Sequence, residues 1–242
     1  MELIRGKNNL QARHRPAAVT IGNFDGVHRG HQVILEQLRA LADSDGLRAT
    51  VMAFEPMPRE YFAPAQAPAR LSRLREKLQA FIDYGVDQFF CLPFNAAVAN
   101  MEPADFVGDL LVRGLGARHV IVGDDFRFGR KRTGDFETLA ALGRDGSFSV
   151  TPMATVLVDG ERVSSTAVRA ALSGGDLDKA RRLLGRRYSM TGHVTYGKAL
   201  GRTLGFPTAN IRPGRRVTPL SGVFAVWAHG IGAQPLPAVA SV

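Results

Sequence analysis

The feature that most constrains the fold is the alternation of short apolar runs with amphipathic segments across residues 17–157. The run Ala17-Ala-Val-Thr-Ile21 is apolar and β-branched, and apolar residues then recur at helical spacing from Ile34 to Ala42. The same alternation predicts strands at 48–54, 87–92, 118–122 and 148–157, and helices at 72–84, 103–113 and 135–143. Strands that alternate with helices of about ten residues indicate an α/β fold of the Rossmann type, with a parallel sheet covered on both faces.

The loops that follow the strands are where a ligand is expected. In open parallel sheets, ligands bind where the strands pass into loops at their carboxyl ends. The loops after residues 21, 54 and 122 are therefore the expected ligand-binding loops.

The residue composition of the sequence changes near residue 185. Residues 176–184 predict a short amphipathic helix, with aspartates near its start and arginines near its end, and Gly185 ends it. Beyond it, Gly, Pro and Thr become frequent, and short β-branched runs at 190–195 and 223–227 predict strands. We predict one domain over residues 1–184 and part of a small all-β barrel domain over residues 185–242.

Cysteine content and the chain ends bear on location. The one cysteine, Cys91, excludes an internal disulfide framework and a multi-cysteine metal site, so a cytoplasmic location is expected. The first residues lack a signal-peptide core, and although residues 217–242 carry no charged side chain, their prolines, glycines and His229 argue against a membrane span.

The net charge of +9 is unevenly distributed. Residues 1–178 hold 21 Lys and Arg against all 22 Asp and Glu, whereas residues 179–242 hold 10 Lys and Arg and no acid. The imbalance suggests that acidic sequence is missing and that the chain is a fragment. It also supports a rival hypothesis, a non-catalytic nucleotide- or nucleic-acid-binding protein with the arginine cluster Arg181, Arg182, Arg186, Arg187, Arg212, Arg215 and Arg216. Because this region lacks interleaved aromatics and a known reading module, no nucleic-acid partner is expected.

The loop after the first predicted strand reads Gly22-Asn-Phe-Asp-Gly-Val-His-Arg-Gly-His31. His28 and His31 are three residues apart at a helix start, so they face the same way beside free helix N–H groups. Gly26 and Gly30 let the main chain approach a ligand closely. A metal pair and two unrelated polar histidines are the alternatives, but no third ligand lies at a useful local spacing, so we favour a phosphate.

Two further segments carry polar groups. Ser164, Ser165 and Thr166 stand at a helix start one turn before Arg169, and together they can donate to phosphoryl oxygens, although alone they are better interpreted as N-cap residues. The segment 122–132 combines paired carboxylates, two aromatics and four basic residues. Such a segment could bind a planar ring and a phosphate, and it could equally be a run of charges exposed to solvent.

Taken in order, these segments resemble the bifunctional bacterial riboflavin kinase/FMN adenylyltransferase (FAD synthetase) family over nearly the whole chain. Residues 22–31 are similar to its H-x-G-H motif and residues 164–169 to its triphosphate motif. Residues 122–129 and 54–58 fall where the family has its ATP and flavin loops. Residues 192–210 are similar to the glycine-rich loop and Pro-Thr-Ala-Asn motif of its kinase module.

The resemblance implies that the first domain transfers AMP from MgATP to the phosphate of FMN, giving FAD and pyrophosphate. His28 and His31 would stabilise the α-phosphate, while Arg169 and the three hydroxyls would hold the phosphates that leave. The implied ATP-binding residues are Gly22, Asn23, Phe24, Asp25, Gly30, Asp125, Ser164, Ser165 and Thr166. For Asp25 and Asp125, adenosine or fold contacts are expected as much as a direct part in transfer.

For the flavin, the resemblance leaves several aromatics, each equally plausible as core. The implied flavin-binding residues are Phe54, Pro56, Phe62, Phe126 and Phe128. The second domain would phosphorylate riboflavin with ATP, with Gly197, Lys198, Thr208 and Asn210 near ATP and with Thr208 near Mg²⁺. The family's catalytic glutamate lies beyond the positions present, so kinase activity is expected to be absent if the chain truly ends at Val242.

Other acceptors remain as alternatives. An H-x-G-H nucleotidyltransferase that uses a nicotinamide or pantetheine phosphate would share the first domain, but the attached kinase-like motif favours flavin. The expected partners are small-molecule substrates, with no membrane, and homo-oligomer formation is left open.

Overall fold

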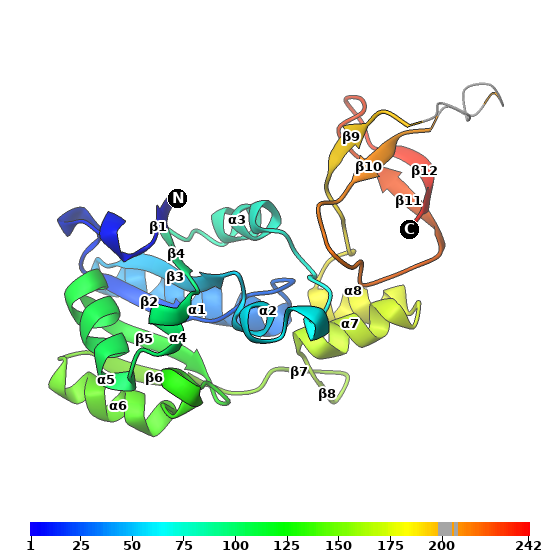
Figure 1. The fold of residues 1–242 in the computed structure, drawn as a ribbon. Coiled ribbons are helices and arrows are strands. Elements are labelled where there is room, and N and C mark those ends of the chain that lie inside the picture. Colours follow the sequence, from blue (N-terminus) through cyan, green and yellow to red (C-terminus); the bar gives the residue numbers. More distant parts are fainter. Residues whose placement is uncertain (198–204, 206–207) are drawn as a thin grey trace.

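The first half of the chain is built on a parallel sheet, as predicted. The computed structural model describes residues 1–197, 205 and 208–242 (Figure 1). Its six-stranded sheet has the order β1-β4-β3-β2-β5-β6, and every neighbouring pair is parallel. The strands are β1 (Glu2–Arg5), β2 (Ala17–Ile21), β3 (Arg48–Glu55), β4 (Gln88–Pro93), β5 (Ala117–Gly123) and β6 (Ser149–Met153).

Helices between these strands cover both faces of the sheet, and two more helices follow its last strand. They are α1 (Arg29–Asp45), α2 (Pro58–Phe62), α3 (Leu74–Asp83), α4 (Ala96–Ala99), α5 (Pro103–Phe106), α6 (Phe136–Asp145), α7 (Ser165–Ser173) and α8 (Leu177–Leu184). Short 3₁₀ turns lie at η1 (Lys7–Asn9), η2 (Ala12–His14), η3 (Pro64–Gln66) and η5 (Arg130–Arg132). The helix predicted over 103–113 forms as α5 followed by a π-helical segment, η4 (Val107–Leu115).

The core lies in two layers, one on each face of the sheet. The strictly alternating side chains of β2 supply both, with Val19 in one layer and Ala18 in the other. The first layer packs against η4 and α6, and the second packs against Leu35 and Leu38 of α1 and Phe81 of α3. This packing holds the carboxyl end of β2 and the start of α1 in place.

One predicted strand is shorter than expected. The apolar run at 148–157 predicts a single strand, but β6 ends at Met153. Residues 157–158 instead pair with residues 161–162 as a small antiparallel hairpin, β7 (Leu157–Val158) and β8 (Glu161–Arg162). Hydrophobic run length does not show where pairing with the neighbouring strand stops, and here β5 offers no partner beyond Gly123.

The second half begins after α8, where Gly185 adopts a left-handed φ of 72°. It contains two antiparallel pairs, β9 (His193–Thr195) with β10 (Asn210–Arg212) and β11 (Val223–Ala228) with β12 (Leu236–Ser241). The predicted strands at 190–195 and 223–227 are therefore confirmed. Within the described residues, no helix is long and apolar enough to cross a membrane.

A third apolar cluster joins the two halves. Leu71 and Leu184 of the first half pack in it with Leu220 of the second, and Tyr188 and Phe224 pack against them. The two halves therefore share one apolar cluster.

Candidate active site

The carboxyl end of β2 lies where the strand order of the sheet reverses. β2 pairs with β3 on one side and with β5 on the other, although β5 comes much later in the chain. Loops at such a switch point diverge and leave room for a ligand. The loop of residues 22–28 leaves β2 at this point and leads directly into α1.

The two predicted histidines come together at the start of α1. His28 is the N-cap residue, and its Nδ1 accepts the main-chain N–H of His31 at 3.3 Å. The two rings stack with 3.6 Å between their centroids. Gly30 lies beside them, and a Cβ there would lie 3.3 Å from the His28 ring, close enough to press against it.

Both imidazoles are held in the neutral form. Burial lowers the pKa of His28 to about 4. Burial also lowers the pKa of His31 well below its ordinary value, and the neighbouring His28 and Lys77 add to the effect. Near neutral pH each ring therefore presents one N–H donor and one acceptor nitrogen. The Nδ1 atom of His31 is buried and has no partner among the described residues.

Phe24 packs its ring against the ring of His31. Its ring is 1% exposed and lies 4.9 Å from the His31 ring and 5.6 Å from the Phe81 ring, centroid to centroid. The side chain of Phe24 is therefore part of the core. Gly22 packs against the same ring, and Asn23 is exposed.

Asp25 joins three segments of the chain. Its carboxylate is 2% exposed and accepts the N–H groups of Leu71 at 3.0 Å and Ser72 at 2.9 Å. It also accepts from Nη2 of Arg169 at 2.5 Å. Asp25 therefore makes a fold contact that joins the loop after β2 to residues 71–72 and to α7.

A second helix start faces the first. Ser164 is the N-cap of α7 and accepts the N–H of Ala167 at 3.1 Å, while the Ser165 hydroxyl donates to the main-chain oxygen of Asp25 at 2.9 Å. A Cβ on Gly30 would lie 3.8 Å from the Val163 oxygen, which places the starts of α1 and α7 side by side. Each start carries N–H groups without helical partners, so two positive dipole ends lie close together.

Thr166 and Arg169 of α7 differ in their exposure to solvent. Thr166 is exposed, whereas Arg169 is mostly buried and also donates from Nε to the Ala69 oxygen at 2.7 Å. Arg169 therefore fixes the loop that holds Asp25 in addition to placing positive charge near the helix starts.

Lys77 of α3 is a site residue that the sequence analysis missed. It is 2% exposed, and its Nζ donates to the Asn23 oxygen at 2.9 Å. Burial lowers the pKa of this lysine. A signal was present in the sequence, because Lys77 lies three residues after Leu74 and four before Phe81, on the apolar stripe of its helix.

A second missed group surrounds Arg70. Its guanidinium pairs with Glu55 at the end of β3 and with Glu60 of α2. Burial raises the pKa of Glu60, but the hydrogen bonds from Arg70 and the Met57 N–H outweigh it and leave that pKa below its ordinary value. This network anchors the loop between β3 and α3.

The predicted flavin residues are part of one aromatic cluster. Phe54 packs edge-on to Phe94 at 5.5 Å, and Phe94 in turn contacts Phe62 at 5.6 Å. Phe62 is 66% exposed and lies against Tyr61, whereas Phe54 is partly buried in the core. Pro56 is exposed at the end of β3. Phe62 therefore offers the open face of the cluster.

The aromatics after β5 form the buried end of the same cluster. Phe126 stacks on Phe128 at 5.5 Å, and Phe106 connects Phe128 to Phe54. Because Phe128 is 5% exposed, its ring is part of the core. Phe94 and Phe106 were not predicted, since only the fold brings them beside the flavin loops.

The other predicted residues lie in contact with β8 or in the second half of the chain. Asp125 is exposed and pairs with Arg162 of β8 at 2.7 Å. In the second half, Gly197 lies against the Asn210 side chain and Thr208 is exposed, while Lys198 lies outside the described residues.

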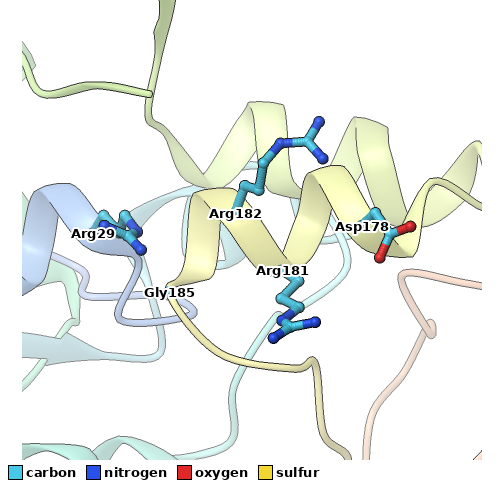
Figure 2. A pocket seen from close by; sticks show the side chains of 5 residues that line it. All are labelled: Arg29, Asp178, Arg181, Arg182 and Gly185. Atoms are coloured by element: carbon cyan, nitrogen blue, oxygen red, sulfur yellow. The ribbon is translucent and has the colours of Figure 1, made fainter. Parts of the chain in front are cut away.

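A basic hollow lies beside Arg29, the first residue of α1. It has a volume of about 420 Å³ and lies between the start of α1 and the end of α8 (Figure 2). Its lining consists of Arg29, Asp178, Arg181, Arg182 and Gly185. In Figure 2 the side chains of Arg181 and Arg182 point to opposite sides of α8, so they do not converge on one point.

The described residues contain no group of three or more His, Cys, Asp or Glu side chains arranged to hold a metal ion. A divalent ion such as Mg²⁺ commonly needs only one or two carboxylates when it also binds substrate phosphates.

Comparison with known proteins identifies relatives over the whole chain. The FAD synthetase family model matches residues 10–167, and the riboflavin kinase family model matches residues 184–242. The chain is 49% identical over 242 residues to a bifunctional riboflavin kinase/FMN adenylyltransferase of Pseudomonas fluorescens, covering all of this chain and 77% of that one. For the protein of the same description from Escherichia coli K12, the identity is 47% over 243 residues, covering 100% and 78%.

A solved structure also matches the entire chain. It is described as a macrolide-efflux protein from Streptococcus pneumoniae, with a TM-score of 0.83 and 27% sequence identity, and the match covers 100% of this chain and 79% of that one.

Proposed function

The chain belongs to the bifunctional riboflavin kinase/FMN adenylyltransferase family, and from this premise we propose that the facing starts of α1 and α7 form its adenylyl-transfer site. The family joins two ATP-using activities, the phosphorylation of riboflavin and the adenylylation of FMN. Two adjacent helix starts with a stacked histidine pair are the observation that supports this placement.

The proposed reaction is a direct displacement. A phosphate oxygen of FMN forms a bond to the α-phosphorus of ATP, and the bond from that phosphorus to the bridging oxygen breaks, so that pyrophosphate leaves and FAD remains. The attacking oxygen is already ionised, so no strong general base is required. Catalysis then depends on positioning and on stabilising negative charge.

His28 and His31 suit the α-phosphate because both are neutral. Two imidazolium ions whose centroids lie 3.6 Å apart would repel each other, whereas two neutral rings can each donate one N–H to a phosphate oxygen. We assign His31 the larger share, since its Nδ1 has no partner within the described part of the chain.

The start of α7 suits the departing phosphates. The hydroxyl of Ser164 accepts from Ala167 and keeps its own hydrogen for a phosphate oxygen, and the exposed Thr166 offers another donor. Arg169 adds positive charge while it holds Asp25. When bound with ATP, Mg²⁺ would neutralise charge on the pyrophosphate.

We assign the flavin ring to the exposed aromatic face around Phe62, which lies beyond the carboxyl ends of β3 and β4. An aromatic face of this kind suits a planar heterocycle. For the kinase reaction, the assigned residues are Gly197, Lys198, Thr208 and Asn210.

The division into domains at residues 1–184 and 185–242 also stays a proposal. A cytoplasmic location is proposed because Cys91 is buried and forms no disulfide.

The test is FAD formation by this chain. Incubation with FMN and MgATP, followed by chromatography, should yield FAD and an equal amount of pyrophosphate. The His31→Ala variant should lose at least ~100-fold in turnover, the scale of losing a charge-stabilising donor. His193→Ala, which removes an exposed histidine of β9, serves as the control. Near-normal turnover in His31→Ala would refute the assignment.

A further inference from the structure

We propose that Arg215, in the part of the chain that matches riboflavin kinase, is a positioning residue for adenylyl transfer in the other half. This inference rests on the proposed function of the two helix starts. Arg215 lies between β10 and β11, whereas the segment that it holds, residues 69–73, leads into α3 (Figure 1).

The Arg215 side chain is almost completely enclosed. It is 1% exposed, and its Nη2 donates to Oε2 of Glu76 at 2.7 Å. Its Nη1 donates to the main-chain oxygens of Arg70 at 3.0 Å and Leu71 at 3.2 Å, and also to the hydroxyl of Tyr188. A guanidinium buried with this many partners fixes the main chain that it touches.

The main chain held by Arg215 is the same main chain that holds Asp25. The carbonyl of Leu71 accepts from Arg215, while its N–H donates to the Asp25 carboxylate at 3.0 Å. The next residue, Ser72, accepts the N–H of Gly26 on its hydroxyl at 2.9 Å. Arg215 is therefore separated from the histidine loop by a single residue of the supporting segment.

Glu76 provides a second route from Arg215 to that loop. Its carboxylate accepts the N–H of Arg73 at 2.6 Å at the start of α3 and the N–H of Thr191 at 2.9 Å. The residue after Glu76 is Lys77, which holds the Asn23 oxygen. The second half thus contacts both supports of the loop, the 69–73 segment and the first turn of α3.

The supporting segment depends on such partners. Residues 67–73 belong to no helix or strand, so their main-chain groups have no repeating hydrogen-bond pattern. Removal of the Arg215 guanidinium would leave two carbonyls and the Glu76 carboxylate without this donor. The expected result is a looser segment and a displaced histidine pair.

This displacement should affect the chemical step more than substrate binding. Small errors in the position of catalytic groups can reduce rates by about 10²-fold, because the transition state tolerates less misplacement than the bound substrate. We therefore expect Arg215→Met to lower kcat for FAD formation by about 10-fold or more, with KM values within about 3-fold of wild type.

The experiment compares Arg215→Met with Arg216→Met. Arg216 is the exposed neighbour, so both variants lose the same charge and only one loses the buried contacts. For each, kcat and KM for FAD formation are measured per folded molecule, together with hydrogen exchange at the N–H groups of Leu71 and Ser72. Arg215→Met should lose both rate and protection, Arg216→Met neither, and Arg215→Lys should retain part of each because it can still reach Glu76.

The results of these measurements distinguish the inference from the proposed function. Equal kcat and equal amide protection in the two methionine variants would overturn the inference. If Arg215→Met does not fold, Glu76→Gln is measured in its place. This substitution weakens the ion pair with Arg215 but keeps the shape of the side chain. A wild-type kcat in Glu76→Gln would also overturn the inference. Failure of the wild-type chain to make FAD would instead refute the proposed function.

Discussion

Replacement of His28 by asparagine should flatten the dependence of stability on pH. His28 is 7% exposed and has a pKa of about 4 in the folded chain, below the ordinary value of 6.5. In the interval between these values the unfolded chain binds the proton and the folded chain does not. The stability that comes from keeping His28 neutral is therefore present above pH 6.5 and is lost as the pH falls toward 4.

The magnitude follows from the size of the shift. A displacement from 6.5 to about 4 corresponds to roughly 3 kcal/mol in full, and about 2 kcal/mol of this is lost between about pH 7.5 and about pH 5. Asparagine is chosen because its side chain can still cap α1, so the helix start is retained while the titrating group is removed.

The assay is urea unfolding followed by far-ultraviolet circular dichroism at several pH values in that interval. Wild type should lose about 2 kcal/mol more on acidification than His28→Asn. His193→Asn, at an exposed position on β9, controls for the loss of a histidine as such. If His28→Asn and wild type lose stability in parallel, the buried neutral imidazole is not the cause and the reasoning fails.

Three further changes test the scaffold and the flavin face. Asp25→Asn should lower the free energy of unfolding by about 3 kcal/mol, because it leaves the Arg169 guanidinium without its buried partner; urea unfolding would measure this, and a loss below about 1 kcal/mol would contradict it. Gly26→Ala should destabilise the fold by more than about 1 kcal/mol by the same assay, since φ is +84° and the new Cβ would lie 2.8 Å from Leu71; a neutral result would show that the loop adapts. Phe62→Ala should leave stability within about 0.5 kcal/mol but raise KM for FMN about 5-fold in steady-state kinetics, and an unchanged KM would exclude its ring from the flavin site.

The sequence predicts those elements whose local pattern agrees with their environment. β2 is apolar at every position except Thr20, and it is buried on both faces. The acidic start, basic end and following glycine of α8 likewise agree with one another, and the helix ends at Leu184. The edge strand β1 was not predicted, because its four residues include two charged ones and its conformation depends on pairing with β4.

The candidate site divides in the same way. The spacing of His28 and His31 at a helix start is local information, so their proximity could be anticipated. Their neutral state could not, because it results from burial by segments distant in sequence. For Asp25, the sequence gives a carboxylate in a ligand loop, and only the position of residues 71 and 72 shows that its lone pairs are already used.

The shared apolar cluster also limits how such genes can recombine. A crossover at the codon for residue 175 would look harmless, since it falls between the family matches at residues 10–167 and 184–242. It would nevertheless take Leu71 from one parent and Leu220 from the other, although the two side chains pack in one core. Chimaeras between diverged parents should therefore be viable mainly when the exchanged halves bring side chains of matching volume to this cluster. The two halves are thus expected to be inherited as one unit.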